Sequence, residues 1–188
     1  MEAYTAGTLA GAGSFHCESC GYAIALHERD AVPSCPRCDS DRFARSSMFA
    51  VDETTAWGAP DVERPEWLET ARESLVTRGD YLAFDDGERL RIVPLQEGWT
   101  RVGRSLAAHV RFDDPTVSRR HALIYCDEDG ARVLDDRSLN GVFRNGDRVE
   151  LAELEDGDEI VVGRYRLHFL EHVEQAATAE AEPIEAAG

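Results

Sequence analysis

Short stretches of alternating apolar and polar residues dominate the chain between residues 80 and 171. The first two stretches, 81–84 and 89–94, flank the turn residues Asp85, Asp86 and Gly87, as the strands of a hairpin do. Further stretches of this kind follow at 100–102, 109–112, 121–126, 131–134, 142–144, 159–162 and 165–170. Because Gly, Asp and Asn turns separate them, the pattern predicts a mainly β fold, an antiparallel sandwich of about ten strands.

The periodicity becomes helical over residues 65–79. Pro65 suits the first turn of a helix, and Gly79 suits its end. Apolar side chains recur at helical spacing along one face, at Trp67, Leu68, Ala71 and Leu75. We therefore expect one linking helix that docks on the following sandwich.

Three other segments lack a pattern that would bury apolar side chains. Residues 1–14 are rich in Ala, Gly and Thr, so we expect a flexible arm. Residues 46–64 contain Gly58 and Pro60 and are typical of a linker. Residues 172–188 are rich in Ala and Glu, and we expect this acidic tail to be disordered.

The charge balance argues against some classes of partner. The 188 residues include 37 acidic and 20 basic side chains, giving a net charge of −17, and all the basic residues are arginine. Because neutralisation of phosphates supplies most non-specific affinity for nucleic acid, this charge argues against nucleic acid as the main partner. The chain has no run of about 20 apolar residues and no secretory signal, so we expect a cytoplasmic protein with no membrane partner.

Four cysteines have the spacing of a metal site. Cys17 and Cys20 form one Cys-x-x-Cys pair, Cys35 and Cys38 form a second, and 14 residues separate the pairs. Two such pairs let four thiolates converge on one tetrahedral metal ion. The alternative of two disulfides does not suit a cytoplasmic chain. Cys126 lies in an apolar strand pattern, where we expect a buried small side chain.

The segment around the four cysteines, about residues 15–45, resembles the zinc-ribbon and rubredoxin-like knuckle families. This resemblance leaves the metal open between zinc and iron, and iron would imply electron transfer. We favour Zn²⁺ because the two pairs are closer together than in free-standing rubredoxins. Since four thiolates complete the shell, we expect His16 and His27 to be surface residues and not ligands.

Arginine, hydroxyl and amide side chains cluster at predicted strand ends between residues 101 and 146. They lie in three short stretches, Gly103-Arg104-Ser105, Ser118-Arg119-Arg120-His121 and Ser138-Leu139-Asn140-Gly141. Arginine and serine are suited to bind an oxyanion, and an asparagine amide can hold an extended peptide backbone. No hydroxyl or thiol is accompanied by a recognisable base and orienting acid, so the sequence predicts a binding protein and not an enzyme.

These stretches, with Asn145-Gly146, resemble the forkhead-associated (FHA) domain over about residues 80–171. That resemblance implies a β-sandwich of about eleven strands whose loops bind peptides carrying phosphothreonine. It implies that Arg104 holds the phosphopeptide, that Ser118 and Arg119 contact the phosphate, and that Asn140 fixes the peptide backbone. Gly103, His121 and Gly141 match positions that shape the loops. Leu139 departs from the threonine that many members have before the asparagine.

The second and third stretches resemble most the actinobacterial FHA regulators of 2-oxoglutarate metabolism, which also have leucine at the position of Leu139. Those regulators carry an acidic Glu-Thr-Thr phosphoacceptor motif before the FHA domain, similar to Glu53-Thr54-Thr55 here. The resemblance implies that a Ser/Thr kinase modifies Thr54 or Thr55 and that this phosphothreonine then occupies the protein's own FHA site. Ala56 departs from the usual serine, and the alternative is a plain acidic linker.

The sequence therefore predicts a phosphothreonine-binding signalling adaptor downstream of a Ser/Thr kinase. Two alternatives stay open. One is a rubredoxin-like iron protein that transfers electrons, and the other is a transcription regulator that combines the zinc ribbon with an FHA module.

Overall fold

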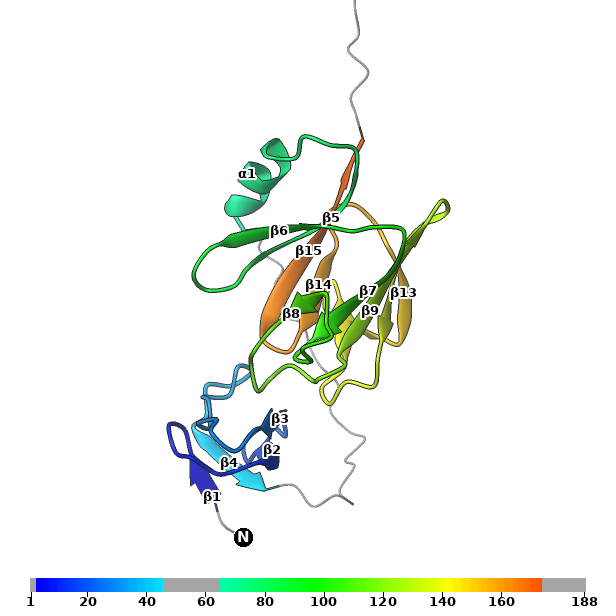
Figure 1. Cartoon of the computed structure of the whole chain (residues 1–188). Helices are drawn as coiled ribbons and strands as arrows, with labels where there is room; N and C mark the ends of the chain where they lie inside the picture. Colours follow the sequence, from blue (N-terminus) through cyan, green and yellow to red (C-terminus); the bar gives the residue numbers. More distant parts are fainter. Residues whose placement is uncertain (1–2, 46–64, 174–188) are drawn as a thin grey trace, which may run out of the picture.

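The computed structural model describes residues 3–45 and 65–173. They form an N-terminal ribbon and a β-sandwich, and Figure 1 shows the ribbon at the end of the sandwich opposite to the helix α1. The linker prediction for 46–64, the phosphoacceptor candidates Thr54 and Thr55, and nearly all of the tail prediction for 172–188 lie outside the described residues.

The ribbon is a four-stranded antiparallel sheet with the order β1-β4-β2-β3. Its strands are β1 (Ala3–Thr5), β2 (Gly13–Cys17), β3 (Ala23–Leu26) and β4 (Arg42–Arg45). The prediction of a flexible arm over residues 1–14 is wrong, since β1 pairs with β4 and β2 begins at Gly13. The physical reason is that Tyr4 packs edge to face on Phe15, at 5.2 Å between ring centroids, and so ties the first strand to the ribbon core.

The sandwich consists of a five-stranded sheet, β13-β10-β9-β7-β8, and a six-stranded sheet, β12-β11-β14-β15-β5-β6. The bounds are β5 (Gly79–Asp85), β6 (Leu90–Pro94), β7 (Gly98–Gly103), β8 (Val110–Arg111), β9 (Ala122–Asp127), β10 (Gly130–Asp135), β11 (Val142–Arg144), β12 (Asp147–Val149), β13 (Leu151–Leu154), β14 (Glu159–Val162) and β15 (Tyr165–His172). Eleven strands in the described part of the sandwich agree with the predicted number.

The period-2 pattern produces the core between the two sheets. Along β9, Ala122, Ile124 and Cys126 are buried while the alternate residues are only partly buried. These side chains share one hydrophobic core with buried residues of the facing sheet, among them Leu82, Ile160 and Leu167. Cys126 is 5% exposed, as predicted, and burial raises its pKa to about 12.

One pair of strands departs from the antiparallel expectation. β7 and β8 are parallel, with Val102 opposite Val110 and Gly103 opposite Arg111. Residues 104–109 loop out and return, and the His109 amide then donates to the Arg101 carbonyl at 2.9 Å. The loop therefore brings β8 back along β7 in the same direction and presents Arg104 at the end of the sheet.

The predicted helix is present but shorter than the span 65–79. Helix α1 runs from Trp67 to Glu73, and its buried residues Leu68 and Ala71 pack with Ala83 and Leu170 of the six-stranded sheet. It docks on the sandwich, as predicted. With seven residues it cannot cross a bilayer, and the described residues contain no other helix that could.

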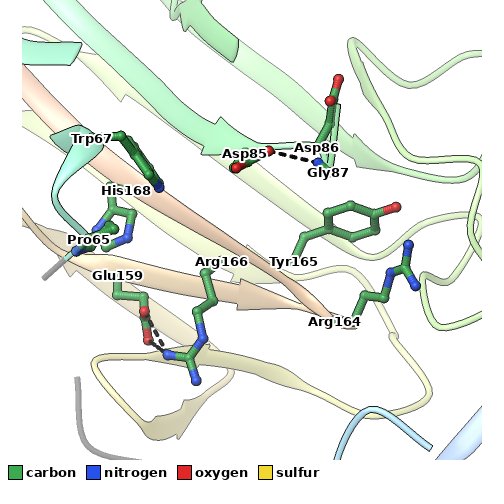
Figure 2. Close-up of a pocket in the computed structure, with 10 residues that line it drawn as sticks. All are labelled: Pro65, Trp67, Asp85, Asp86, Gly87, Glu159, Arg164, Tyr165, Arg166 and His168. Atoms are coloured by element: carbon green, nitrogen blue, oxygen red, sulfur yellow. Dashed lines mark hydrogen bonds and ion pairs between the residues drawn. The ribbon is translucent and has the colours of Figure 1, made fainter. Parts of the chain in front are cut away.

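A shallow pocket of about 360 Å³ lies between the start of α1 and the sheet. Figure 2 shows Trp67 beside His168, whose rings meet edge to face at 5.3 Å, and Glu159 paired with Arg166 at 2.7 Å. Its lining residues are different from every residue of the predicted phosphopeptide site. The Glu159–Arg166 ion pair joins β14 to β15, and the Trp67–His168 contact attaches the start of the helix to the sheet.

Asp158 anchors the turn at Asn145 and Gly146. Its buried carboxylate accepts hydrogen bonds from the Arg144 guanidinium and the Asn145 amide, each at 2.6 Å, and from the Glu155 backbone amide at 2.7 Å. Burial alone would raise the pKa of Asp158, but these three donors outweigh it and hold that pKa below its usual range.

We expect Asp158→Ala to lower the free energy of unfolding by about 2 kcal/mol at pH 7, because it removes three hydrogen bonds to one buried carboxylate. A depressed carboxyl pKa stabilises the fold above the unfolded value of about 3.9. The difference between wild type and variant should therefore shrink as the pH falls below about 4. Urea unfolding at pH 7 and at a pH below about 4 measures this difference in the free energy of unfolding. Asp147→Ala is the matched control, because Asp147 is exposed in the β11–β12 hairpin whose turn Asp158 anchors. It should change stability by less than about 0.5 kcal/mol.

Candidate functional site

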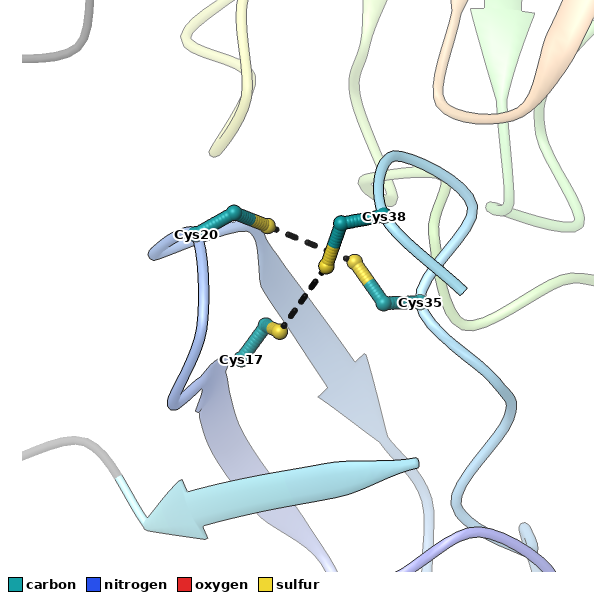
Figure 3. Close-up of side chains that lie close together, drawn as sticks. All are labelled: Cys17, Cys20, Cys35 and Cys38. Atoms are coloured by element: carbon teal, nitrogen blue, oxygen red, sulfur yellow. Dashed lines mark hydrogen bonds between the residues drawn. The ribbon is translucent and has the colours of Figure 1, made fainter. Parts of the chain in front are cut away.

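The four cysteines of the ribbon converge, as predicted (Figure 3). Their sulfur atoms all lie within 4.8 Å of one another. Cys17 Sγ is 3.6 Å from Cys38 Sγ, and Cys20 Sγ is 3.5 Å from Cys35 Sγ. A tetrahedral zinc ion with Zn–S bonds of about 2.3 Å separates its sulfur ligands by about 3.8 Å. The donor set therefore fits one four-coordinate metal ion.

The two cysteine pairs sit on nearly identical backbone turns. The Cys17 amide donates to the Tyr22 carbonyl and the Cys35 amide to the Ser40 carbonyl, at 2.8 and 2.9 Å. The residue that follows each pair, Gly21 or Asp39, has a positive φ of 74° or 55° and donates its amide to the carbonyl of the first cysteine. Each turn thus aims two sulfur atoms at the same point.

The cysteines differ in how readily they form the thiolate that metals bind: burial raises the pKa of Cys20 and Cys35, whereas hydrogen bonds lower the pKa of Cys17. Burial raises the pKa of Cys17, yet bonds from the Ser19 and Cys20 backbone and from neighbouring thiols lower it to about 7. His16 is partly buried and His27 is exposed, and neither belongs to the ligand cluster. Cys17, Cys20, Cys35 and Cys38 would hold the metal, whose role is to fix the ribbon fold.

The predicted phosphopeptide residues come together on neighbouring loops at the ribbon end of the sandwich. Arg104, Ser118 and Asn140 are each less than 10% exposed, although all three are polar. The Arg104 amide donates to the Ser118 carbonyl at 2.9 Å, and the Leu139 amide donates to the Ser118 hydroxyl oxygen at 3.0 Å. Ser118 therefore links the loop that carries Arg104 to the loop that carries Asn140.

Gly103 and His121 hold these loops at close range. A Cβ at Gly103 would lie 2.5 Å from the Arg119 carbonyl oxygen, so only glycine allows this approach. The fully buried His121 ring accepts a hydrogen bond from the Ser118 amide at Nδ1 and contacts the Gly141 carbonyl at 3.2 Å through Nε2. Burial lowers the pKa of His121, which favours the neutral ring with its proton on Nε2.

Asn140 grips the backbone of the ribbon strand β3. Its side-chain oxygen accepts from the Ala23 amide at 2.9 Å, and its side-chain nitrogen donates to the Ala23 carbonyl at 2.7 Å. Two residues further along β3, the Ala25 amide donates to the Pro115 carbonyl at 2.9 Å. The sandwich loops thus hold an extended backbone with the kind of contact predicted for a bound peptide.

Arg104 points at the same segment of the ribbon. Its guanidinium donates to the Ala25 carbonyl at 3.0 Å and to the Asp30 carboxylate at 2.6 Å. The Arg104 side chain is 6% exposed and that of Asp30 is 22% exposed, so this ion pair is largely shielded from water. Burial raises the pKa of Asp30, but the His27 amide and the Arg104 guanidinium outweigh it and hold the pKa below its usual range.

Tyr22 extends the contact between the two parts of the chain. It precedes β3 and is 3% exposed. Burial raises the pKa of its hydroxyl. Among the smaller effects on this pKa, hydrogen bonds from Thr116 and Asn140 lower it, and the charge of Asp114 raises it. This phenol is therefore buried against the loop that carries Asn140 and the loop before Ser118.

The remaining predicted site residues lie at the edge of the cluster. Arg119 is exposed beside Ser118, and the Leu139 side chain is 49% exposed. Sequence reasoning missed Tyr22, Ala23, Ala25 and Asp30, because nothing in their pattern marks a contact with residues more than 70 positions away. The repeated small residues at 23 and 25, which let the strand approach closely, are the only signal at these positions.

Comparison with protein families agrees with this architecture. Residues 100–163 match the model of the FHA domain, and residues 1–47 match that of the zinc-ribbon containing domain. This match includes the segment 1–14 that was predicted to be a separate arm. The chain is thus an FHA-domain protein with an N-terminal zinc ribbon.

Two curated relatives show to which family of FHA-domain proteins the chain belongs. The glycogen accumulation regulator GarA of Mycolicibacterium smegmatis is 41% identical over 147 residues, which cover 77% of this chain and 92% of that protein. The oxoglutarate dehydrogenase inhibitor of Corynebacterium glutamicum is 40% identical over 145 residues, which cover 77% of this chain and 96% of that protein. The chain belongs to the family of FHA regulators that includes these two proteins.

The FHA domain also has solved counterparts. One, from a structural and functional study of phosphothreonine-dependent FHA domain interactions, is 36% identical and covers 50% of this chain and 98% of its own, with a TM-score of 0.48.

Proposed function

We propose that this protein is a cytoplasmic signalling adaptor that binds phosphothreonine in proteins modified by a Ser/Thr kinase. In this proposal Arg104, Ser118 and Arg119 contact the phosphate, and Asn140 fixes the peptide backbone. A zinc ion bound by the four cysteines holds the ribbon in shape. The chain acts by binding and not by catalysis, in line with relatives named as a regulator and an inhibitor.

The observation that carries this proposal is the pair of contacts made by Asn140 and Arg104. Asn140 makes two hydrogen bonds to one backbone position, at 2.9 and 2.7 Å, which is how a side-chain amide recognises an extended chain. Arg104 holds a carboxylate beside that chain at 2.6 Å. A phosphothreonine peptide combines the same two features, an extended backbone and an anion, with a charge of about −1.5 to −2 on the phosphate.

Thr54 and Thr55 are our candidates for a phosphoacceptor within the chain. They follow Asp52 and Glu53 and lie between the ribbon and the sandwich in the sequence. We propose that phosphorylation of either threonine produces an internal ligand for the FHA site.

Fluorescence polarisation with labelled peptides tests the site. The probes are a library with one fixed central phosphothreonine and the peptide of residues 49–60 phosphorylated on Thr54 or Thr55. We expect phosphorylated probes to bind, unphosphorylated ones not to bind, and Arg104→Ala or Ser118→Ala to weaken binding about 10- to 100-fold, the value of a charge-assisted hydrogen bond.

Arg89→Ala removes an exposed arginine of the β5–β6 hairpin and serves as the control for lost positive charge. Its affinity should stay within about twofold of wild type. Equal binding by Arg104→Ala and Arg89→Ala would refute the site. The site would also be refuted if no phosphothreonine probe bound either wild type or Asp30→Ala, the variant without the ribbon carboxylate that Arg104 holds.

A further inference from the structure

The ribbon strand β3 and the residues after it contact the loops of the proposed phosphopeptide site. Asn140 holds the Ala23 backbone at two points, and Arg104 holds both the Ala25 carbonyl and the Asp30 carboxylate. These are the side chains on which the proposed function depends. A phosphopeptide and the ribbon therefore require the same donors and acceptors and cannot bind together.

We propose that the zinc ribbon is a built-in, unphosphorylated ligand of the FHA site, with Asp30 in the place of the phosphate. This inference rests on the proposed function. The ribbon closes the site before any kinase acts, and a phosphothreonine peptide must displace the strand β3 to bind.

The structure of β3 suits it to this role. β3 is an edge strand of the ribbon sheet, and Ile24 and Leu26 are buried in the ribbon core. The alternate residues Ala23 and Ala25 direct their backbone groups at the sandwich loops. An edge strand presents unpaired backbone donors and acceptors, which makes it a template for binding in the manner of an extended peptide. The ribbon can thus dock without any change in its own fold.

The energetics allow closure and opening. A tethered ligand acts at an effective concentration of about millimolar, so even weak docking keeps the site mostly occupied. Asp30 carries a single negative charge, whereas a phosphate carries about −1.5 to −2 and three acceptor oxygens. A phosphate therefore offers Arg104 and Ser118 the stronger contact. The ribbon then sets a threshold of affinity that separates phosphothreonine ligands from weaker anionic peptides.

Two variants of the full chain weaken the docking by independent routes. Asp30→Ala removes the ion pair with Arg104. Ala25→Pro removes the amide that donates to Pro115, at an edge-strand position where proline is tolerated. Asp41→Ala is the matched control, because Asp41 lies on the ribbon beside Ala6, next to the opposite edge strand β1. Zinc content confirms that each variant keeps its ribbon.

The first measurement is amide hydrogen exchange of residues 23–26, and the second is polarisation with the phosphothreonine library. We expect slow exchange at Ala23 and Ala25 in wild type and Asp41→Ala, and faster exchange at Ala23 in the two opened variants, since the proline variant has no amide at position 25. Phosphopeptide binding should be at least about fivefold tighter in both of them. The gain reflects the larger fraction of molecules with an open site.

The outcomes separate the two proposals. Unprotected Ala25 in the wild type overturns the docking, whatever the peptides do. Equal peptide affinity for wild type, Asp30→Ala and Ala25→Pro overturns the competition while the proposed function stands. Protected Ala25 in wild type with no phosphopeptide bound by any variant supports the docking and overturns the proposed function.

Discussion

Replacement of Cys35 by serine is expected to abolish metal binding and unfold the ribbon while the sandwich stays folded. The ribbon core consists of nine buried side chains, two of which are the ligands Cys17 and Cys35. A core of this size cannot offset the conformational entropy of about 40 residues. Metal binding supplies about 10–16 kcal/mol in comparable four-ligand sites, and the loss of one buried thiolate removes most of it.

The sandwich should be insensitive to this change, because its hydrophobic core is separate from that of the ribbon. Elemental analysis should give one zinc per wild-type chain and less than about 0.1 in the variant. Amide NMR should lose the dispersed signals of residues 3–45 and keep those of 79–172. If the ribbon also closes the FHA site, the same variant should bind phosphothreonine peptides more tightly.

Cys126→Ala is the control, since Cys126 is buried in the sandwich core and lies outside the ligand cluster. It should keep the metal and lose about 1 kcal/mol of sandwich stability. A Cys35→Ser protein with full metal content and an intact ribbon spectrum would show that this cysteine is not a ligand. A coloured protein with bound iron would favour the electron-transfer alternative over a structural zinc site.

The parts of the fold that the sequence predicted are those set by local patterns. The alternation of Ala122, Ile124 and Cys126 identifies a strand with one buried face, even when the neighbouring strands are unknown. The two Cys-x-x-Cys turns are likewise local, since the residues that close them, Gly21 and Asp39, directly follow each pair. The loop residues Arg104, Ser118 and Asn140 were proposed because their types suit an oxyanion and an extended backbone, and the structure brings them together.

The parts that were missed depend on contacts between distant segments. The first strand lies in a stretch of small and polar residues, and its pairing with β4 and the contact of Tyr4 with Phe15 fix it to the ribbon. Asp30 looks like a solvated turn residue until Arg104, 74 positions later, is placed beside it. No periodicity encodes such a pairing, so the contact of β3 with the sandwich loops could be found only from the structure.

Replacement of His121 by alanine should cost about 3–4 kcal/mol of sandwich stability and loosen the predicted phosphopeptide site. The ring is 0% exposed, so its removal leaves a cavity. It also leaves the Ser118 amide without its acceptor at 3.0 Å and the Gly141 carbonyl without its partner at 3.2 Å. Because these bonds join the loops of Ser118 and Asn140, phosphopeptide affinity should fall at least tenfold in the variant.

The pH dependence separates this role from a general packing defect. Burial lowers the pKa of His121, so protonation favours the unfolded chain, and the wild type loses stability as the pH falls below the unfolded value of about 6.5. The alanine variant lacks this contribution, and the stability gap should therefore narrow between pH 7 and pH 5. Urea unfolding at both pH values measures the gap.

His109→Ala, at an exposed position, is the control and should leave stability within about 0.5 kcal/mol and peptide affinity within about twofold of wild type. A gap that stays constant with pH would contradict the neutral, hydrogen-bonded ring between the two loops.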